Sequence, residues 1–207
     1  MYGLIGYYGL TRWWDTALTP VERRRVESVF APMGNSNPRP LTTGQVGAIQ
    51  GEMATATGLL SSLVGWLSAS DEDVAIRRKI RAKLLELVDD EPSLISRHFS
   101  LQVLIGEFYR DRDGDPLALA AAIDACRAQI RIAPGVANAM SSMFKGFLPR
   151  HVGYEKLAII HEKAREYEEA IAVSLEAKAA GWGPDWDKRI ARCRKRLEGI
   201  VQRTRDA

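Results

Sequence analysis

Apolar residues recur at three- and four-residue steps along most of this chain, which is the spacing of one face of an α-helix. Runs that alternate strictly between apolar and polar residues, as half-buried strands do, are nearly absent. The most regular helical stripe lies near the C-terminus and consists of Trp186, Ile190, Cys193, Leu197 and Ile200. The pattern therefore predicts an all-α fold.

Capping signals locate helices in the N-terminal half of the chain. Thr19-Pro20-Val21-Glu22 forms a capping box with proline at the first helical position, which predicts a helix from there to about Phe30. Residues 31–40 contain three prolines and a glycine, so we expect a loop. Ser70 with Asp73 predicts the start of another helix, with a stripe formed by Ile76, Ile80, Leu84 and Leu87.

Between these two signals, a helix is predicted from Thr42 or Thr43 to about Ser68. It is rich in small residues, and each glycine costs about 1 kcal/mol relative to alanine in a helix. This use of glycine indicates either close helix packing or a break near Gly58. Residues 53–70 lack charge, but serines and threonines dilute the apolar residues, and a membrane span needs about 20 predominantly apolar ones. We therefore expect a buried core helix and no membrane partner.

The C-terminal half follows the same pattern. Helices are expected from Ser93 to about Arg110 and from Asp115-Pro116 to Pro134-Gly135, the second with the stripe Leu119, Ile123, Cys126, Ile130 and Ala133. Residues 135–149 read as a connection with a short helix at 139–144. Further helices are expected at 149–165, at 167–180 with Gly181 as the C-cap, and from just after Asp185 onward.

Composition is that of an ordinary globular protein. The 207 residues are 46% hydrophobic and 27% charged, with a formal charge of +3. Cys126 and Cys193 lie on predicted apolar stripes, so both are expected to be buried free thiols, which suits a reducing cytoplasm. Residues 1–10 carry no positive charge and do not form a signal peptide, so a cytoplasmic location is expected.

Catalytic and metal-binding motifs fail on inspection. The Asp111–Asp115 loop alternates acidic residues as a calcium loop does, but Pro116 and Ala122 stand where glycine and glutamate are required. His161-Glu162 begins like a zinc-protease helix without its second histidine. We predict no metal and no cofactor, and an enzyme built on a helical scaffold is the least favoured of the function hypotheses.

The last helix is strongly basic and carries Lys188, Arg189, Arg192, Arg194, Lys195 and Arg196, followed by Arg203 and Arg205. Such a helix could bind an acidic partner or the phosphate backbone of a nucleic acid. A solvated outer face is the favoured interpretation, because no exposed aromatic residues or base-reading motif accompany the charge.

Residues 150–184 resemble one tetratricopeptide repeat. The family's pattern is matched by Tyr154-x2-Leu157-Ala158-x2-His161, then Ala170-x3-Ser174, with Pro184 slightly late. Large residues on the first helix face small ones on the second, so the two axes can approach. His161 and Ser174 depart from the family's aromatic residues. A weaker copy includes Ala122-Ile123, so the resemblance covers about residues 94–184.

The resemblance implies antiparallel helical hairpins stacked as a short α-α superhelix over residues 93–207, with the last helix as a cap, preceded by a helical region at 1–92 of no recognisable family. It also implies that a protein or peptide partner binds the concave face lined by the first helices of the hairpins. On the better-matched hairpin that face would present Val152, Glu155, Ile159, Glu162 and Lys163. A scaffold or protein-interaction module is the leading hypothesis, and a nucleic-acid-associated regulator is the alternative.

Overall fold

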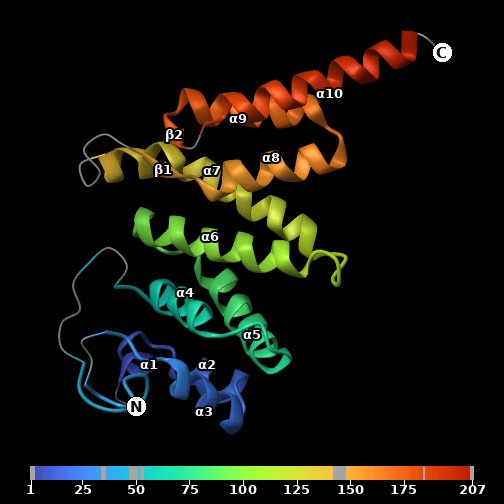
Figure 1. Ribbon diagram of the computed structural model, residues 1–207. Helices are drawn as coiled ribbons and strands as arrows, with labels where there is room; N and C mark the ends of the chain where they lie inside the picture. Colours follow the sequence, from blue (N-terminus) through green and yellow to red (C-terminus); the bar gives the residue numbers. More distant parts are fainter. Residues whose placement is uncertain are drawn as a thin grey trace. The chain divides into compact units, whose positions relative to one another are not determined.

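The fold was analysed in a computed structural model, which describes residues 3–33, 36–46, 51, 54–141, 148–183 and 185–205. Helices dominate these residues, as predicted, and one pair of short parallel strands accompanies them (Figure 1). The chain divides into two compact units, Met1–Glu107 and Phe108–Ala207. Among the helices of the described residues, none is both long enough and apolar enough to cross a membrane.

The first unit contains α1 (Leu4–Tyr7), α2 (Thr11–Ala17), α3 (Pro20–Val29), α4 (Ala56–Trp66), α5 (Asp71–Leu87) and most of α6 (Leu94–Asp111). The second unit contains the last turn of α6, then α7 (Ala118–Ser141), β1 (Leu148–Arg150), α8 (Val152–Ala164), α9 (Tyr167–Ala179), β2 (Trp182–Gly183) and α10 (Asp187–Arg205).

Two predicted helix starts are confirmed in atomic detail. The Thr19 hydroxyl accepts a hydrogen bond from the Glu22 amide (3.3 Å), and the Glu22 carboxylate accepts one from the Thr19 amide (2.7 Å). The Ser70 hydroxyl accepts a hydrogen bond from the Asp73 amide (3.4 Å) at the start of α5. Both caps satisfy backbone N–H groups that a helix leaves without partners in its first turn.

The small-residue helix is shorter than predicted. Residues 41–46 form turns and bends, and α4 begins only at Ala56, capped by the Thr55 hydroxyl. Residues 47–50 and 52–53 of the predicted helix lie outside the described residues. Glycine and threonine disfavour helix in the segment before Thr55, and the backbone carbonyls of Pro40, Leu41 and Gly44 instead accept hydrogen bonds from the amides of Leu4, Ile5 and Gly3.

Proline was wrongly expected to end α7. Pro134 lies inside this helix, which continues to Ser141. Ala133, Val136 and Met140 are buried on both sides of it, and this packing offsets the hydrogen bond that proline cannot donate. Of the short helix expected at 139–144, residues 139–141 belong to α7 and 142–144 lie outside the described residues. The helix expected from Pro149 begins at Val152 instead, because 148–150 form β1.

Unit 1 is held together by a mixed apolar and polar interior. Ile76, Ile80 and Leu84 of the predicted α5 stripe are fully buried. Between α4 and α6 the contacts are hydroxyl pairs one helical turn apart: Thr57 with Ser96 (3.1 Å) and Ser61 with Ser100 (3.2 Å). Short side chains at these positions let two helices approach closely while their hydroxyls satisfy one another.

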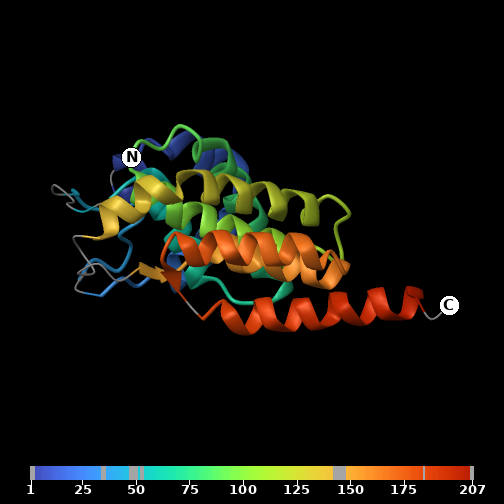
Figure 2. The same ribbon diagram turned by 90° about the horizontal axis from the view of Figure 1, so that it is seen from above.

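Unit 2 is built from helices that pack in sequence order, with α7 against α8, α8 against α9 and α9 against α10. Figure 1 shows the last three side by side, and in Figure 2 the C-terminal part of α10 extends past the ends of α8 and α9. Tyr167 and Ala170 of α9 form a buried cluster with Cys193 of α10. Both cysteines are buried free thiols, as predicted.

The approach of α7 to α8 depends on a glycine. The Gly153 amide donates to the side-chain oxygen of buried Gln129 (2.7 Å), and a Cβ at position 153 would lie only 2.8 Å from that oxygen. The same Cβ would lie 3.0 Å from the Cys126 carbonyl oxygen, so a larger residue would require Gln129 or the backbone of α7 to shift. The buried face of α7 is correspondingly lined by Ala118, Ala122, Ala125, Cys126, Gln129 and Ala133, whereas Leu119, predicted to be in the core, is exposed.

The two short strands were not predicted. β1 and β2 pair in parallel, with Leu148 opposite Trp182, and this pairing brings the Trp182 ring against buried His151 (ring centroids 4.7 Å apart). His151 is also the N-cap of α8, because its Nδ1 accepts a hydrogen bond from the Tyr154 amide (3.3 Å). The strands therefore fix the position from which α8 starts.

Candidate functional site

A cavity of about 360 Å³ lies between α8 and α10 in unit 2. Its lining consists of Ile159, Glu162 and Lys163 from α8, Tyr167 from the start of α9, and Arg189, Arg192 and Arg196 from α10. We call it the α8–α10 cavity. It combines two apolar or aromatic side chains with four cations and one carboxylate, which leaves a formal charge of +3.

Helical spacing aligns these side chains. Residues three, four or seven positions apart lie on one face of a helix, so Ile159, Glu162 and Lys163 share a face of α8. Arg189, Arg192 and Arg196 share a face of α10 by the same rule. Because α9 packs against both helices, it holds the two faces at the cavity.

The Glu162 carboxylate lies at the centre of the cavity's charge. It accepts hydrogen bonds from Arg189 Nη1 (2.9 Å) and from Arg192 Nε (2.6 Å) and Nη2 (2.9 Å). The hydrogen bond from Arg192 holds the pKa of Glu162 below its usual range, against a smaller opposing effect of burial. A carboxylate bound in this way stays ionised at neutral pH and positions two guanidinium groups, which makes it a poor general base.

The remaining charge is available to a ligand. Arg196 and Lys163 are exposed, and the Arg192 side chain keeps 47% of its exposure despite its pairing with Glu162. Guanidinium groups offer several N–H donors in a planar fork that matches a carboxylate or phosphate. The arrangement can therefore bind an anionic group beside the apolar surface of Ile159.

Cys193 is the neighbour of the cavity residue Arg192 in sequence, but its side chain is buried in the core. This burial is the main cause of the raised pKa of the Cys193 thiol. Within the described part of the chain, no cluster of three histidine, cysteine or acidic side chains is arranged to hold a metal ion.

The predicted partner-binding residues divide into two groups. Ile159, Glu162 and Lys163 line the α8–α10 cavity, whereas Val152 and Glu155 do not. Glu155 forms an ion pair with Arg150 instead, and Lys163 also lies over the ring of Tyr109, 5.5 Å from its centroid. The face of α8 predicted from sequence is therefore shared between a cavity and a separate surface pair.

Tyr167, Arg189, Arg192 and Arg196 were missed as members of this site. The sequence predicts the basic last helix and the face of α8 as two separate candidates. The spacing of the three arginines did contain a signal, because it places them on one helical face, but only tertiary packing brings that face to Glu162.

Comparisons with known proteins give no match. No family model matches the chain, and no curated protein or solved structure matches it either.

Proposed function

We propose that this protein is an interaction module that binds an acidic segment of a partner protein in the α8–α10 cavity. The observation that carries the proposal is the excess of positive charge around a partly apolar cavity. The resemblance of residues 150–184 to a tetratricopeptide repeat supports it, because members of that family bind peptide segments on the face that includes Ile159, Glu162 and Lys163.

The chemistry favours a peptide with both acidic and apolar residues. Glu162 occupies part of the bonding capacity of Arg189 and Arg192, but a guanidinium has five N–H donors, so each retains donors for a ligand carboxylate. Ile159 is half-buried and contributes an apolar surface. A bound segment would pair its carboxylates with the arginines and place an apolar side chain on Ile159.

Two matched double variants test this proposal. Lys163→Gln/Arg196→Gln removes two cations from the cavity, and Arg194→Gln/Lys195→Gln removes two exposed cations of α10 that do not line it. Each variant and the wild-type chain are tagged and used to capture partners from native lysate at low and high salt. We expect the first variant to lose the wild-type protein partner, with affinity falling about tenfold or more, because each charge-assisted hydrogen bond contributes about 1.5–3 kcal/mol.

The control variant should keep the partner with little change. Equal loss from both variants would contradict a site confined to the cavity. Recovery of nucleic acid alone, weakened equally by both variants and released steeply by salt, would favour the basic helix as a nucleic-acid contact, because phosphate contacts release counterions.

A further inference from the structure

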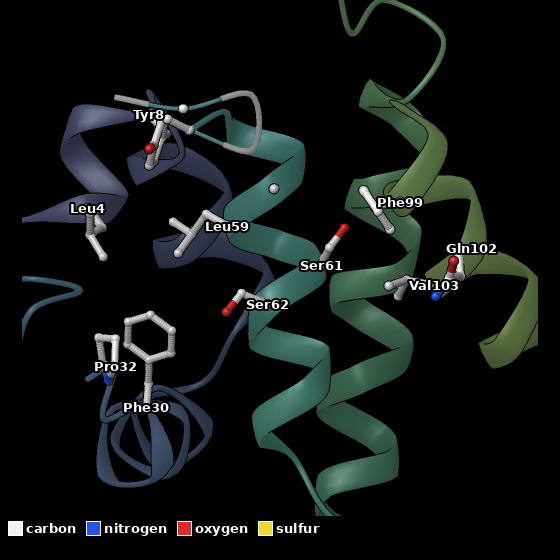
Figure 3. Close-up of a pocket in the computed structure, with 13 residues that line it drawn as sticks. Leu4, Tyr8, Phe30, Pro32, Leu59, Ser61, Ser62, Phe99, Gln102 and Val103 are labelled. Carbon is white, nitrogen blue, oxygen red and sulfur yellow. The ribbon is translucent and has the colours of Figure 1, made fainter. Parts of the chain in front are cut away.

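Unit 1 contains another cavity, of about 610 Å³, which the proposed function does not use. It lies along α4, where Gly58 and Ser62 contribute to its lining. Figure 3 shows Leu4 and Phe30 on one side of α4 and Phe99 on the other. Its volume falls within the range of about 300–1,000 Å³ that is typical of small-molecule sites. We call it the α4 cavity.

The lining of the α4 cavity is apolar and uncharged. Aliphatic and aromatic side chains such as Leu4, Phe30 and Phe99 dominate it, and none of the described residues that line it carries a formal charge. The polar side chains among the described lining residues are Tyr8, Ser61, Ser62 and Gln102. Burial is the main cause of the raised pKa of Tyr8, so its hydroxyl remains a neutral hydrogen-bond donor.

A glycine inside α4 opens this face of the helix. Gly58 lies in the first turn of α4 and lines the cavity, although glycine is less favourable in a helix than alanine. Without a side chain there, a ligand can approach the helix backbone closely. The glycine thus provides space on the face of α4 that also carries Ser62.

We propose that the α4 cavity binds a neutral, largely apolar small molecule that contains an aromatic ring system. A charged ligand would lose its hydration on entering the cavity and would meet no opposite charge among the described lining residues, which is costly. A peptide segment would bring a backbone donor and acceptor with every residue, and the lining offers few polar groups to satisfy them. Phe30 and Tyr8, on the same side of α4, provide rings against which an aromatic ligand can pack (Figure 3).

The test uses the full-length chain and the neutral fluorophore N-phenyl-1-naphthylamine. We expect saturable binding at one site per chain, with a rise in the fluorescence of the probe. Ser62→Phe should weaken binding by about tenfold or more, because a phenyl ring at this exposed position of the lining fills space that the probe would occupy. Thr16→Phe adds the same ring at an exposed site on α2 and should leave binding unchanged.

A tryptophan beside the cavity reports where the probe binds. Trp66 lies edge-to-face against Phe30, with ring centroids 5.9 Å apart, so a probe in the α4 cavity should quench its emission. Trp66→Phe should remove that part of the quenching while circular dichroism shows an unchanged helix content.

Three results would overturn the proposal. The first is the absence of saturable binding by a chain that is folded by circular dichroism. The second is equal binding by the wild type and the Ser62→Phe variant. The third is self-association of the wild-type chain, seen by sedimentation, that Ser62→Phe abolishes, because the cavity would then be an interface between copies. None of these results bears on the α8–α10 cavity, whose test uses different variants.

Discussion

In unit 1 the Arg77 guanidinium and the Glu107 carboxylate are buried together, with each side chain less than one-tenth exposed. In unit 2 the Glu162 carboxylate meets Arg189 and Arg192 at the edge of an open cavity, where the Arg192 side chain is half exposed. Both are ion pairs between glutamate and arginine. One connects α5 to α6 inside the core, and the other connects α8 to α10 beside a surface with surplus positive charge.

The difference separates charge that is neutralised by a partner inside the fold from charge that is in excess at a cavity. Asp73 follows the first pattern, because it is fully buried and accepts hydrogen bonds from Arg25 and from the amide and hydroxyl of Ser68. Such groups are satisfied within the fold and have little left to offer a ligand. The α8–α10 cavity has four cations for one carboxylate, and this excess is what a partner could use.

The largest effect is expected from the buried pair of unit 1. Glu107→Leu should lower the free energy of unfolding by about 3–5 kcal/mol, because the Arg77 guanidinium stays buried without its carboxylate. Urea denaturation measures the loss. The double variant Arg77→Met/Glu107→Leu should recover much of it, and a double variant less stable than Glu107→Leu would show that the pair is not the cause.

A smaller effect with a pH signature is expected at Asp73. Hydrogen bonds from Arg25 hold the pKa of Asp73 well below its usual value of about 3.9. The group therefore stabilises the fold at neutral pH, and this contribution is lost as the pH falls below about 4, towards the lowered pKa.

Asp73→Asn should accordingly cost about 2–3 kcal/mol at pH 7 and progressively less at acid pH. Urea midpoints of the wild type and the variant, measured from pH 7 to pH 3, should converge. Glu22 and Glu162 also have lowered pKa values. Both residues are present in the wild type and in the Asp73→Asn variant, so the difference in stability between these two proteins reports on Asp73. A pH-independent gap would contradict this account.

The smallest effect on stability is expected in unit 2. Glu162→Gln removes the charge but keeps an oxygen that accepts a hydrogen bond, and Arg192 stays half exposed to water, so the free energy of unfolding should fall by about 1 kcal/mol, well below the loss in Glu107→Leu. Affinity for an acidic partner should rise instead, because the cavity gains one unit of positive charge. A loss of stability as large as that of Glu107→Leu would remove the distinction between the two units.

Local signals account for the parts of the fold that sequence predicted well. Helix starts at Thr19 and Ser70 were predictable because a cap involves residues only three positions apart. The β1–β2 pair was not, because it joins two segments of three and two residues that are remote in the chain. The continuation of α7 through Pro134 likewise depends on burial of residues on both sides of it.

The candidate site was predictable in part for the same reason. The family pattern selected a face of α8, and Ile159, Glu162 and Lys163 of that face line the cavity. The spacing of Arg189, Arg192 and Arg196 along the sequence places them on one face of a helix. It does not show that this face lies opposite Glu162. The sequence did not predict the α4 cavity. The glycine-rich composition around Gly58 indicated only close helix packing or a break in the helix.

Site-specific photo-crosslinking tests the central claim most directly. A benzophenone amino acid is placed at Ile159 inside the α8–α10 cavity, or at Leu175, an exposed apolar residue of α9 outside it. Irradiation in native lysate should link a partner to position 159 and not to position 175, and the link should disappear with Lys163→Gln/Arg196→Gln. A link from position 175 but not from 159, or one that survives that double substitution, would contradict the account.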